Sequence, residues 1–293
     1  MKPIFNLVAI MATICTSFWM CSSDAAQFAA KKTKADYRPV THKEAMDTLR
    51  TNENAAVEPV DVEAISKAEV AALFKKLNFT TLFAKEYPDN GFFGRDRYRI
   101  EVIISEVKKD ASDPTLYHVK GKNRHKEVIT LFEGELKFEG ITKLNDPNLD
   151  VAEVENMEAS VGKIYAMNGT YILREDPKSA YSGVFQGKIQ TDFVINDDNS
   201  LDLWYYSQSD IKGCGYKFDG NWTSNQNGKS KAALWAADLF AIGNDILKDF
   251  SYGEREVEIN EKYRDLGWAD WWSGEEWWND SPKKEGKEAT KSL

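Results

Sequence analysis

The stretch Tyr216-Lys217-Phe218-Asp219-Gly220-Asn221-Trp222-Thr223-Ser224 has the cleanest alternation of residue types in this 293-residue chain. An extended backbone points successive side chains to opposite sides. One side then carries Tyr216, Phe218, Gly220 and Trp222, and the other carries polar residues. A period of two predicts an antiparallel strand over about 214–224, with one face in a core and one face in water.

The same alternation recurs in the preceding part of the chain. The further strands that it predicts cover about 98–105, 116–119, 126–140, 163–174, 183–196 and 201–207. Their outward positions carry charged residues such as Glu133 and Glu135. A regular row of carboxylates is typical of a solvated sheet face rather than of a catalytic pair. Seven such strands predict a mainly β domain.

Glycine follows an aromatic residue by two positions at four places in these strands: Phe132-Glu133-Gly134, Phe138-Glu139-Gly140, Phe185-Gln186-Gly187 and Phe218-Asp219-Gly220. A glycine inside a strand usually marks a bulge, a bend or a close backbone approach. Its repetition suits a strongly coiled sheet that closes on itself. We therefore predict an antiparallel meander of about seven or eight strands, closing into a barrel-like (calycin-like) sheet. The alternative is a β-sandwich.

The segments that flank the strands carry weaker signals. Ser66 and Glu69 form a capping box, and the stripe that follows predicts a helix over about 62–77; its apolar residues are Val70, Leu73, Phe74 and Leu77. The Pro and Asn-Gly of Glu86–Gly91 predict a turn. The apolar run at 232–237 has no clear period, so two short helices and an irregular crossover both remain open.

Residues 1–25 have the pattern of an export signal. Lys2 precedes an apolar run from Ile4 to Met20, and small residues follow it. The run is too short for a convincing membrane span, so the chain is not expected to be an integral membrane protein. We predict an exported protein, periplasmic or secreted. The alternative is a lipoprotein anchored through Cys21.

The remaining boundaries follow from composition. Residues 26–60 show no sustained period, which predicts a disordered tether, and the Lys- and Glu-rich residues 281–293 predict a disordered tail. Residues 61–280 are then a single β-rich domain, with the helix at its start.

The charge of the chain argues against nucleic acid as a partner. Its net charge is −9, and removal of residues 1–25 leaves this value unchanged because it takes away one Lys and one Asp. Binding to a phosphate backbone requires basic patches. His118 and His125 flank a predicted turn and could approach each other, but no third ligand is near, so no zinc site and no cofactor are predicted. No common catalytic signature appears.

Tryptophan is concentrated near the end of the chain. Gly267–Asp280 contains five of the nine tryptophans, interleaved with four carboxylates. The segment is either a strap that closes the domain or a surface for a partner or ligand, because indole rings suit both roles. In each of the doublets 271–272 and 277–278 at least one ring should stay partly exposed. The candidate binding residues are Trp204, Trp222, Trp268, Trp271, Trp272, Trp277 and Trp278.

Several segments resemble those of a group of exported or cell-envelope bacterial proteins, notably from Bacteroidetes. The segments are Tyr87–Ile100, Val119–Arg124, Phe132–Gly134 and Phe218–Ser224, and the similarity spans about 85–270. The resemblance implies an exported, β-rich bacterial protein and implies no activity. Relatives often carry Cys-x-Trp where this chain has Ala233-Leu234-Trp235.

These observations favour an exported cell-envelope binding or interaction protein without catalytic activity, whose partner is an unknown protein or glycan. Aromatic density without catalytic groups is the reason. One alternative is a glycan-acting hydrolase that uses tryptophan platforms and a carboxylate pair such as Glu275 and Glu276. Another is an envelope inhibitor or immunity protein.

Overall fold

The computed structural model describes residues 61–145, 163–206 and 209–239, together with 241, 243, 251–252, 257–258, 260–269 and 276–279. All of them belong to one compact unit, Val57–Leu293. The predicted export signal, tether and C-terminal tail lie outside the described residues, and so does the start of the unit before Asp61.

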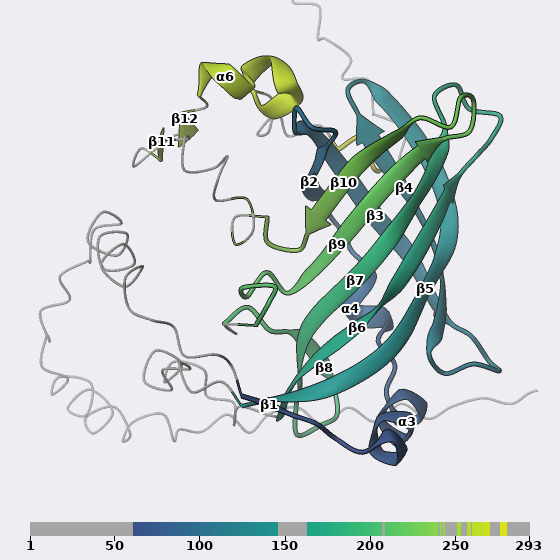
Figure 1. Cartoon of the computed structure of the whole chain (residues 1–293), viewed down its shortest axis with the longest axis vertical. Helices are drawn as coiled ribbons and strands as arrows, with labels where there is room; N and C mark the ends of the chain where they lie inside the picture. The colour runs from purple at the N-terminus through teal and green to yellow at the C-terminus, as the bar shows by residue number, and fades with distance from the viewer. Residues whose placement is uncertain are drawn as a thin grey trace, which may run out of the picture. The chain divides into compact units, whose positions relative to one another are not determined.

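Within the described residues, ten strands form one antiparallel sheet (Figure 1). They are β1 Asp61–Glu63, β2 Asp89–Phe93, β3 Tyr98–Lys109, β4 Leu116–His125, β5 Val128–Asn145, β6 Lys163–Glu175, β7 Gly183–Ile195, β8 Leu201–Leu203, β9 Tyr216–Ser224 and β10 Ser230–Ala236. A separate pair of two-residue strands joins β11 Ser251–Tyr252 to β12 Val257–Glu258.

Eight of these strands hydrogen-bond in a closed ring. The order is β2-β3-β4-β5-β6-β7-β9-β10, and β10 pairs with β2 to complete it. Strands that follow one another in the ring also follow one another in the sequence, except that the short β8 comes between β7 and β9 in the sequence. β8 is outside the ring and pairs only with β7. β1 pairs only with β5. The predicted antiparallel meander of seven or eight strands, closing into a barrel-like sheet, is confirmed.

Two strands of the ring differ from the sequence-based prediction. β2 occupies the predicted turn, and β10 occupies the run expected to form helices or a crossover. β10 lies between β9 and β2, where Leu234 pairs with both Asp219 and Phe92. Its inward residues Ala233 and Trp235 are buried. Pairing on both sides and burial therefore outweigh the weak local signal of an alanine-rich run.

Two of the strand glycines show why the sheet can coil. Between Phe138 and Gly140 the pairing of β5 with β6 shifts register by one residue, which is a bulge next to this glycine. Gly187 of β7 and Gly220 of β9 lie opposite each other, and a Cβ atom on Gly187 would stand 2.2 Å from the carbonyl oxygen of Asp219. The predicted roles of bulge and close backbone approach are both present.

Two helices lie at one end of the ring (Figure 1). α3 (Lys67–Lys76) begins after Ser66, whose Oγ accepts a hydrogen bond from the backbone of Glu69. It begins at 67 rather than 62 because 61–63 pair with β5 as β1. The short α4 (Thr80–Phe83) follows, and Phe79 and Phe83 are fully buried against Phe138 inside the ring. None of the helices in the described part of the chain is long and apolar enough to span a membrane.

The C-terminal residues pack on the outer face of β2, β3 and β4. α6 (Glu261–Tyr263) leads into a turn, Arg264–Trp268, that is kinked at Leu266 and Gly267. Trp268 is fully buried against Phe92, and its indole Nε1 donates to the carbonyl of Arg97 (3.1 Å). Trp277 Nε1 donates to Glu101 Oε1 (3.2 Å). Of the predicted strap, Gly267–Asp280, the described residues 267–269 and 276–279 therefore pack on the ring.

Candidate functional site

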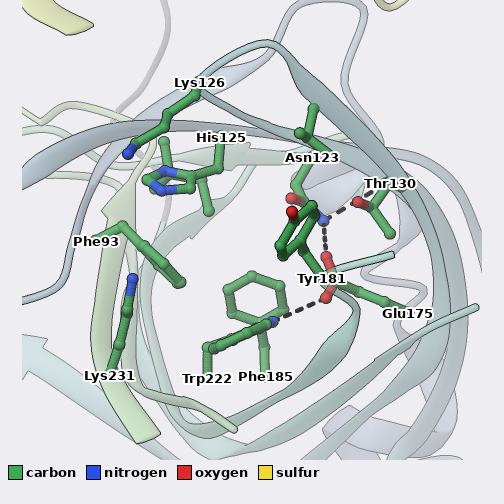
Figure 2. A pocket seen from close by; sticks show the side chains of 12 residues that line it. Phe93, Asn123, His125, Lys126, Thr130, Glu175, Tyr181, Phe185, Trp222 and Lys231 are labelled. Carbon is green, nitrogen blue, oxygen red and sulfur yellow. Dashed lines mark hydrogen bonds between the residues drawn. The ribbon is translucent and has the colours of Figure 1, made fainter. Parts of the chain in front are cut away.

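The ring holds a cavity of about 330 Å³ at the end opposite the two helices, and Figure 2 shows the side chains that line it. Strand ends and hairpin loops of the ring supply its walls. The residues that line it are Phe93, Ile100, Asn123, His125, Lys126, Val128, Thr130, Glu175, Tyr181, Phe185, Trp222 and Lys231. A volume of this size is at the lower end of the range for small-molecule sites.

The apolar wall of the cavity continues the inward rows of the strands. Phe93 of β2, Phe185 of β7 and Trp222 of β9 come from three different strands. The ring of Phe93 lies 5.5 Å from that of Trp222 and 6.3 Å from that of Phe185, centroid to centroid. Rings at these distances are in edge-on or tilted contact and form an apolar wall.

A buried carboxylate also lines the cavity. Glu175, at the end of β6, is only 4% exposed. Its Oε1 accepts from Asn123 Nδ2 (2.7 Å), and its Oε2 accepts from Trp222 Nε1 (2.8 Å) and from the backbone N–H of Gly183 (2.6 Å). Burial raises the pKa of Glu175, and these three hydrogen bonds oppose the rise. The carboxylate thereby fixes Trp222 and joins β4, β6, β7 and β9.

His125, at the end of β4, lies between the rings of Phe93 (4.5 Å) and Tyr98 (4.9 Å). Burial, together with the positive charges of Lys231 and Lys126, lowers the pKa of His125 to about 4. The imidazole is therefore neutral at neutral pH. Its Nδ1 is buried and has no hydrogen-bond partner in the described part of the chain.

Two lysines stand at the mouth of the cavity. The ammonium of Lys231 lies 5.0 Å from the ring centre of Phe93, and that of Lys126 lies 5.1 Å from the ring centre of Tyr98. Both side chains are exposed, and neither ammonium forms an ion pair with the residues that the structure describes. Lys126 has a left-handed backbone, with a φ of 57°.

The loop between β6 and β7 completes the rim. Tyr181 is 72% exposed and lies over the cavity (Figure 2). The next residue, Ser182, is buried and accepts hydrogen bonds from the backbone and the side chain of Asn225, in the turn after β9. The loop is therefore fastened at Ser182, while the ring of Tyr181 stays in contact with water.

The predicted tryptophan residues do not form one site. Trp222 lines the cavity. Trp204 is buried in a separate apolar cluster with Leu144, Ile164 and Val194, away from the cavity lining. Trp268 is buried in the strap, and Trp271 and Trp272 lie outside the described residues.

The last tryptophan doublet lies against the outer wall of the ring. Trp277 and Trp278 are both partly exposed, as predicted for this pair. Arg124 lies over the ring of Trp277 at 5.4 Å, and Trp278 packs edge-on against Tyr87. These contacts favour the structural role of the strap over a free binding surface.

The two histidines are not neighbours. His118 and His125 lie near opposite ends of the same strand, β4. The prediction that they could approach each other assumed a turn between them, and the chain is extended there instead. His118 pairs with Asp110 (2.9 Å). Within the described residues no group of three potential ligands could hold a metal ion.

The polar residues of the cavity were not singled out from the sequence, although a signal for them exists. Asn123 continues the inward row of Tyr117 and Val119, and Glu175 continues that of Tyr171 and Leu173. A polar residue at an inward position near a strand end is the pattern that could have identified them. The predicted ends of these strands, at 119 and 174, stop short of both.

Comparisons with protein-family models, with curated proteins and with solved structures find no match to this chain. The resemblance to exported bacterial proteins therefore stays a prediction.

Proposed function

We propose that this chain is an exported, non-catalytic binding protein that holds a small, mainly apolar ligand at the open end of its strand ring. The export part of the proposal rests on the N-terminal sequence pattern. The binding part rests on the cavity of about 330 Å³ and its aromatic wall of Phe93, Phe185 and Trp222. Concave apolar sites with a few placed polar groups are typical of ligand binding, and a ring of eight strands can hold one such ligand.

The main support for the proposal is that hydrogen bonds hold side chains of the cavity wall in place. Trp222 stands at the open end, yet Glu175 holds its indole by a hydrogen bond of 2.8 Å. Glu175 itself is anchored by Asn123 and Gly183. A wall fixed in this way loses little side-chain entropy when a ligand stacks on it, which favours affinity.

The same residues argue against glycan hydrolysis. Hydrolysis of a glycosidic bond generally uses two carboxylates that flank it. Glu175 is the single carboxylate among the residues that line the cavity, and three donors already occupy its oxygens. The sequence also offered the pair Glu275 and Glu276. Glu276 is exposed and accepts a hydrogen bond from Asn279, and Glu275 lies outside the described residues. Binding is therefore the better-supported function.

A neutral apolar probe tests the proposal. Phenylnaphthylamine should gain fluorescence with the wild-type protein. Val128→Trp should weaken its binding roughly tenfold or more, because Val128 lines the cavity and a larger side chain there fills it. Ile129→Trp is the matched control, since Ile129 is the next residue of β5, is 47% exposed and is absent from the lining.

The outcome depends on the difference between the two variants. Equal binding by Val128→Trp and Ile129→Trp would place the probe elsewhere and overturn the proposal. So would the absence of a fluorescence change with the wild-type protein.

A further inference from the structure

We infer that the cavity selects amphipathic anions: an apolar body enters the aromatic wall while an anionic group stays at the mouth, between Lys126 and Lys231. This inference rests on the proposed binding function and adds the chemical class of the ligand. The apolar part would contact Phe93, Phe185 and Trp222, and the anionic part would replace water at the two ammonium groups.

The register of the strands places Lys231 where an apolar residue is expected. On β10 the inward residues Ala233 and Trp235 are 1% exposed, and Lys231 continues the same row toward the open end. Its ammonium lies over the face of Phe93, 5.0 Å from the ring centre. A lysine on the inward row is part of the cavity lining rather than of the solvated outer face.

Lys126 reaches the mouth from a strained position. It belongs to the two-residue turn between β4 and β5, where His125 pairs with Val128. Its φ of 57° lies in the left-handed region, which asparagine and glycine adopt at lower cost than lysine. A lysine in this conformation raises the energy of the backbone. Strained residues of this kind cluster at ligand sites, and Lys126 lies at the mouth of the cavity.

The charge balance of the lining also favours an anion. The chain carries a net charge of −9, but the lining contains two lysines and one carboxylate. Glu175 already accepts three hydrogen bonds, and the neutral His125 adds no positive charge. Asp96 acts on His125 from nearby but does not line the cavity. The two ammonium groups are therefore the charges that a ligand meets, without a carboxylate paired to them within the described residues.

Two probes with the same aromatic body separate charge from apolar contact. Anilinonaphthalene sulfonate carries one sulfonate, and phenylnaphthylamine carries none. The sulfonate should bind more tightly than the neutral probe at low salt, and its affinity should fall as salt is added while that of the neutral probe changes little. Titration followed by fluorescence measures both dissociation constants.

Removal of the two charges tests the residues directly. Lys126→Gln combined with Lys231→Gln should raise the dissociation constant of the sulfonate roughly tenfold more than it raises that of phenylnaphthylamine. The matched control is Lys163→Gln combined with Lys188→Gln. Both control lysines are exposed and lie outside the lining, and the net charge changes by the same amount.

The results distinguish the two claims. If both probes bind equally and the Lys126/Lys231 variant changes neither, the inference about anions is overturned while the binding function stands. If Val128→Trp fails to block either probe, the binding function is overturned as well. Selective loss of the sulfonate in the mouth variant, without loss in the control variant, supports the inference.

Discussion

The two ends of the strand ring are built from the same inward pattern but finished in different ways. At one end Phe83 of α4 and Phe79, the residue before this helix, pack against Phe138 and Phe193, so that aromatic rings fill the space. At the other end no helix of the described residues enters, and Phe93 and Trp222 border a cavity instead. A ring of strands therefore encloses a packed core at one end and a cavity at the other, according to what closes each end.

Each end also contains a partly or fully buried acid, and the two acids differ in their partners. Glu175 at the open end accepts three hydrogen bonds. Asp89 at the filled end accepts one from the hydroxyl of Tyr216, and burial raises the pKa of Asp89 to about 7. The carboxylate of Glu175 thus accepts more hydrogen bonds than that of Asp89.

The largest effect should come from truncating the aromatic ring that fills the closed end. Phe79→Ala should lower the free energy of unfolding by about 3–5 kcal/mol, because Phe79 is fully buried among four aromatic rings. Phe93→Ala should cost less, at the lower end of that range, about 3 kcal/mol, since Phe93 borders the cavity and has rings on fewer sides. Chemical denaturation measures both values. Equal losses would remove the distinction between the ends.

The next effect concerns the buried carboxylate of the cavity. Glu175→Ala leaves Asn123, Gly183 and Trp222 without their acceptor and should cost about 2–3 kcal/mol of unfolding free energy. Glu175→Gln keeps one acceptor oxygen and should cost about 1 kcal/mol. Equal stability of the alanine and glutamine variants would show that the three hydrogen bonds of Glu175 do not stabilise the open end.

Asp89 should make the closed end sensitive to pH. An acid with a raised pKa binds more protons in the folded than in the unfolded state, so stability is lost as the pH rises between the two pKa values. For Asp89 this window runs from 3.8 to about 7. We expect a loss of about 2 kcal/mol across it, below the full value of the shift because Asp89 is partly exposed.

The control for this pH dependence is Asp89→Asn, which can still accept from Tyr216 and does not titrate. Denaturation at several pH values between 4 and 8 should give a flatter profile for the variant than for the wild-type protein. Identical profiles would contradict the raised pKa of Asp89.

The smallest effect lies on the outside of the wall, in the strap. Trp277→Phe removes the hydrogen bond to Glu101 and should cost about 0.5–1 kcal/mol. Trp278→Phe keeps its packing against Tyr87 and should cost less. Because neither residue lines the cavity, both variants should bind the fluorescent probes as the wild-type protein does. A weakened probe affinity would show that the strap influences the site.

Strand periodicity made most of the ring predictable. Inward residues such as Phe132, Tyr171, Phe193 and Phe218 are buried as their phase indicates. The failures have local causes. Asp89-Asn90-Gly91 has the chemistry of a turn but is held in β2 by β3 and β10, and the alanines of β10 carry no period that separates strand from helix.

The cavity was largely beyond prediction for a different reason. Its walls combine Phe93, Asn123, Glu175, Trp222 and Lys231, which lie far apart in the sequence and meet only once the ring is closed. Composition directed attention to the tryptophan-rich segment, because indole density is visible in any sequence. The site that the fold builds contains one tryptophan, Trp222, and owes its character to polar residues at inward positions near strand ends.

Closure of the ring by β10 and β2 also bears on the order in which the chain folds. Leu234 pairs with Phe92, which is made much earlier during synthesis. Until Ser230–Ala236 emerges, β2 and β9 both present unpaired backbone groups, and such edges favour association between chains. Contacts so distant in sequence slow folding. A chain that stops before Ser230 is therefore expected to be an open, association-prone sheet, and the last strand of the ring serves as much to protect its neighbours as to complete the wall.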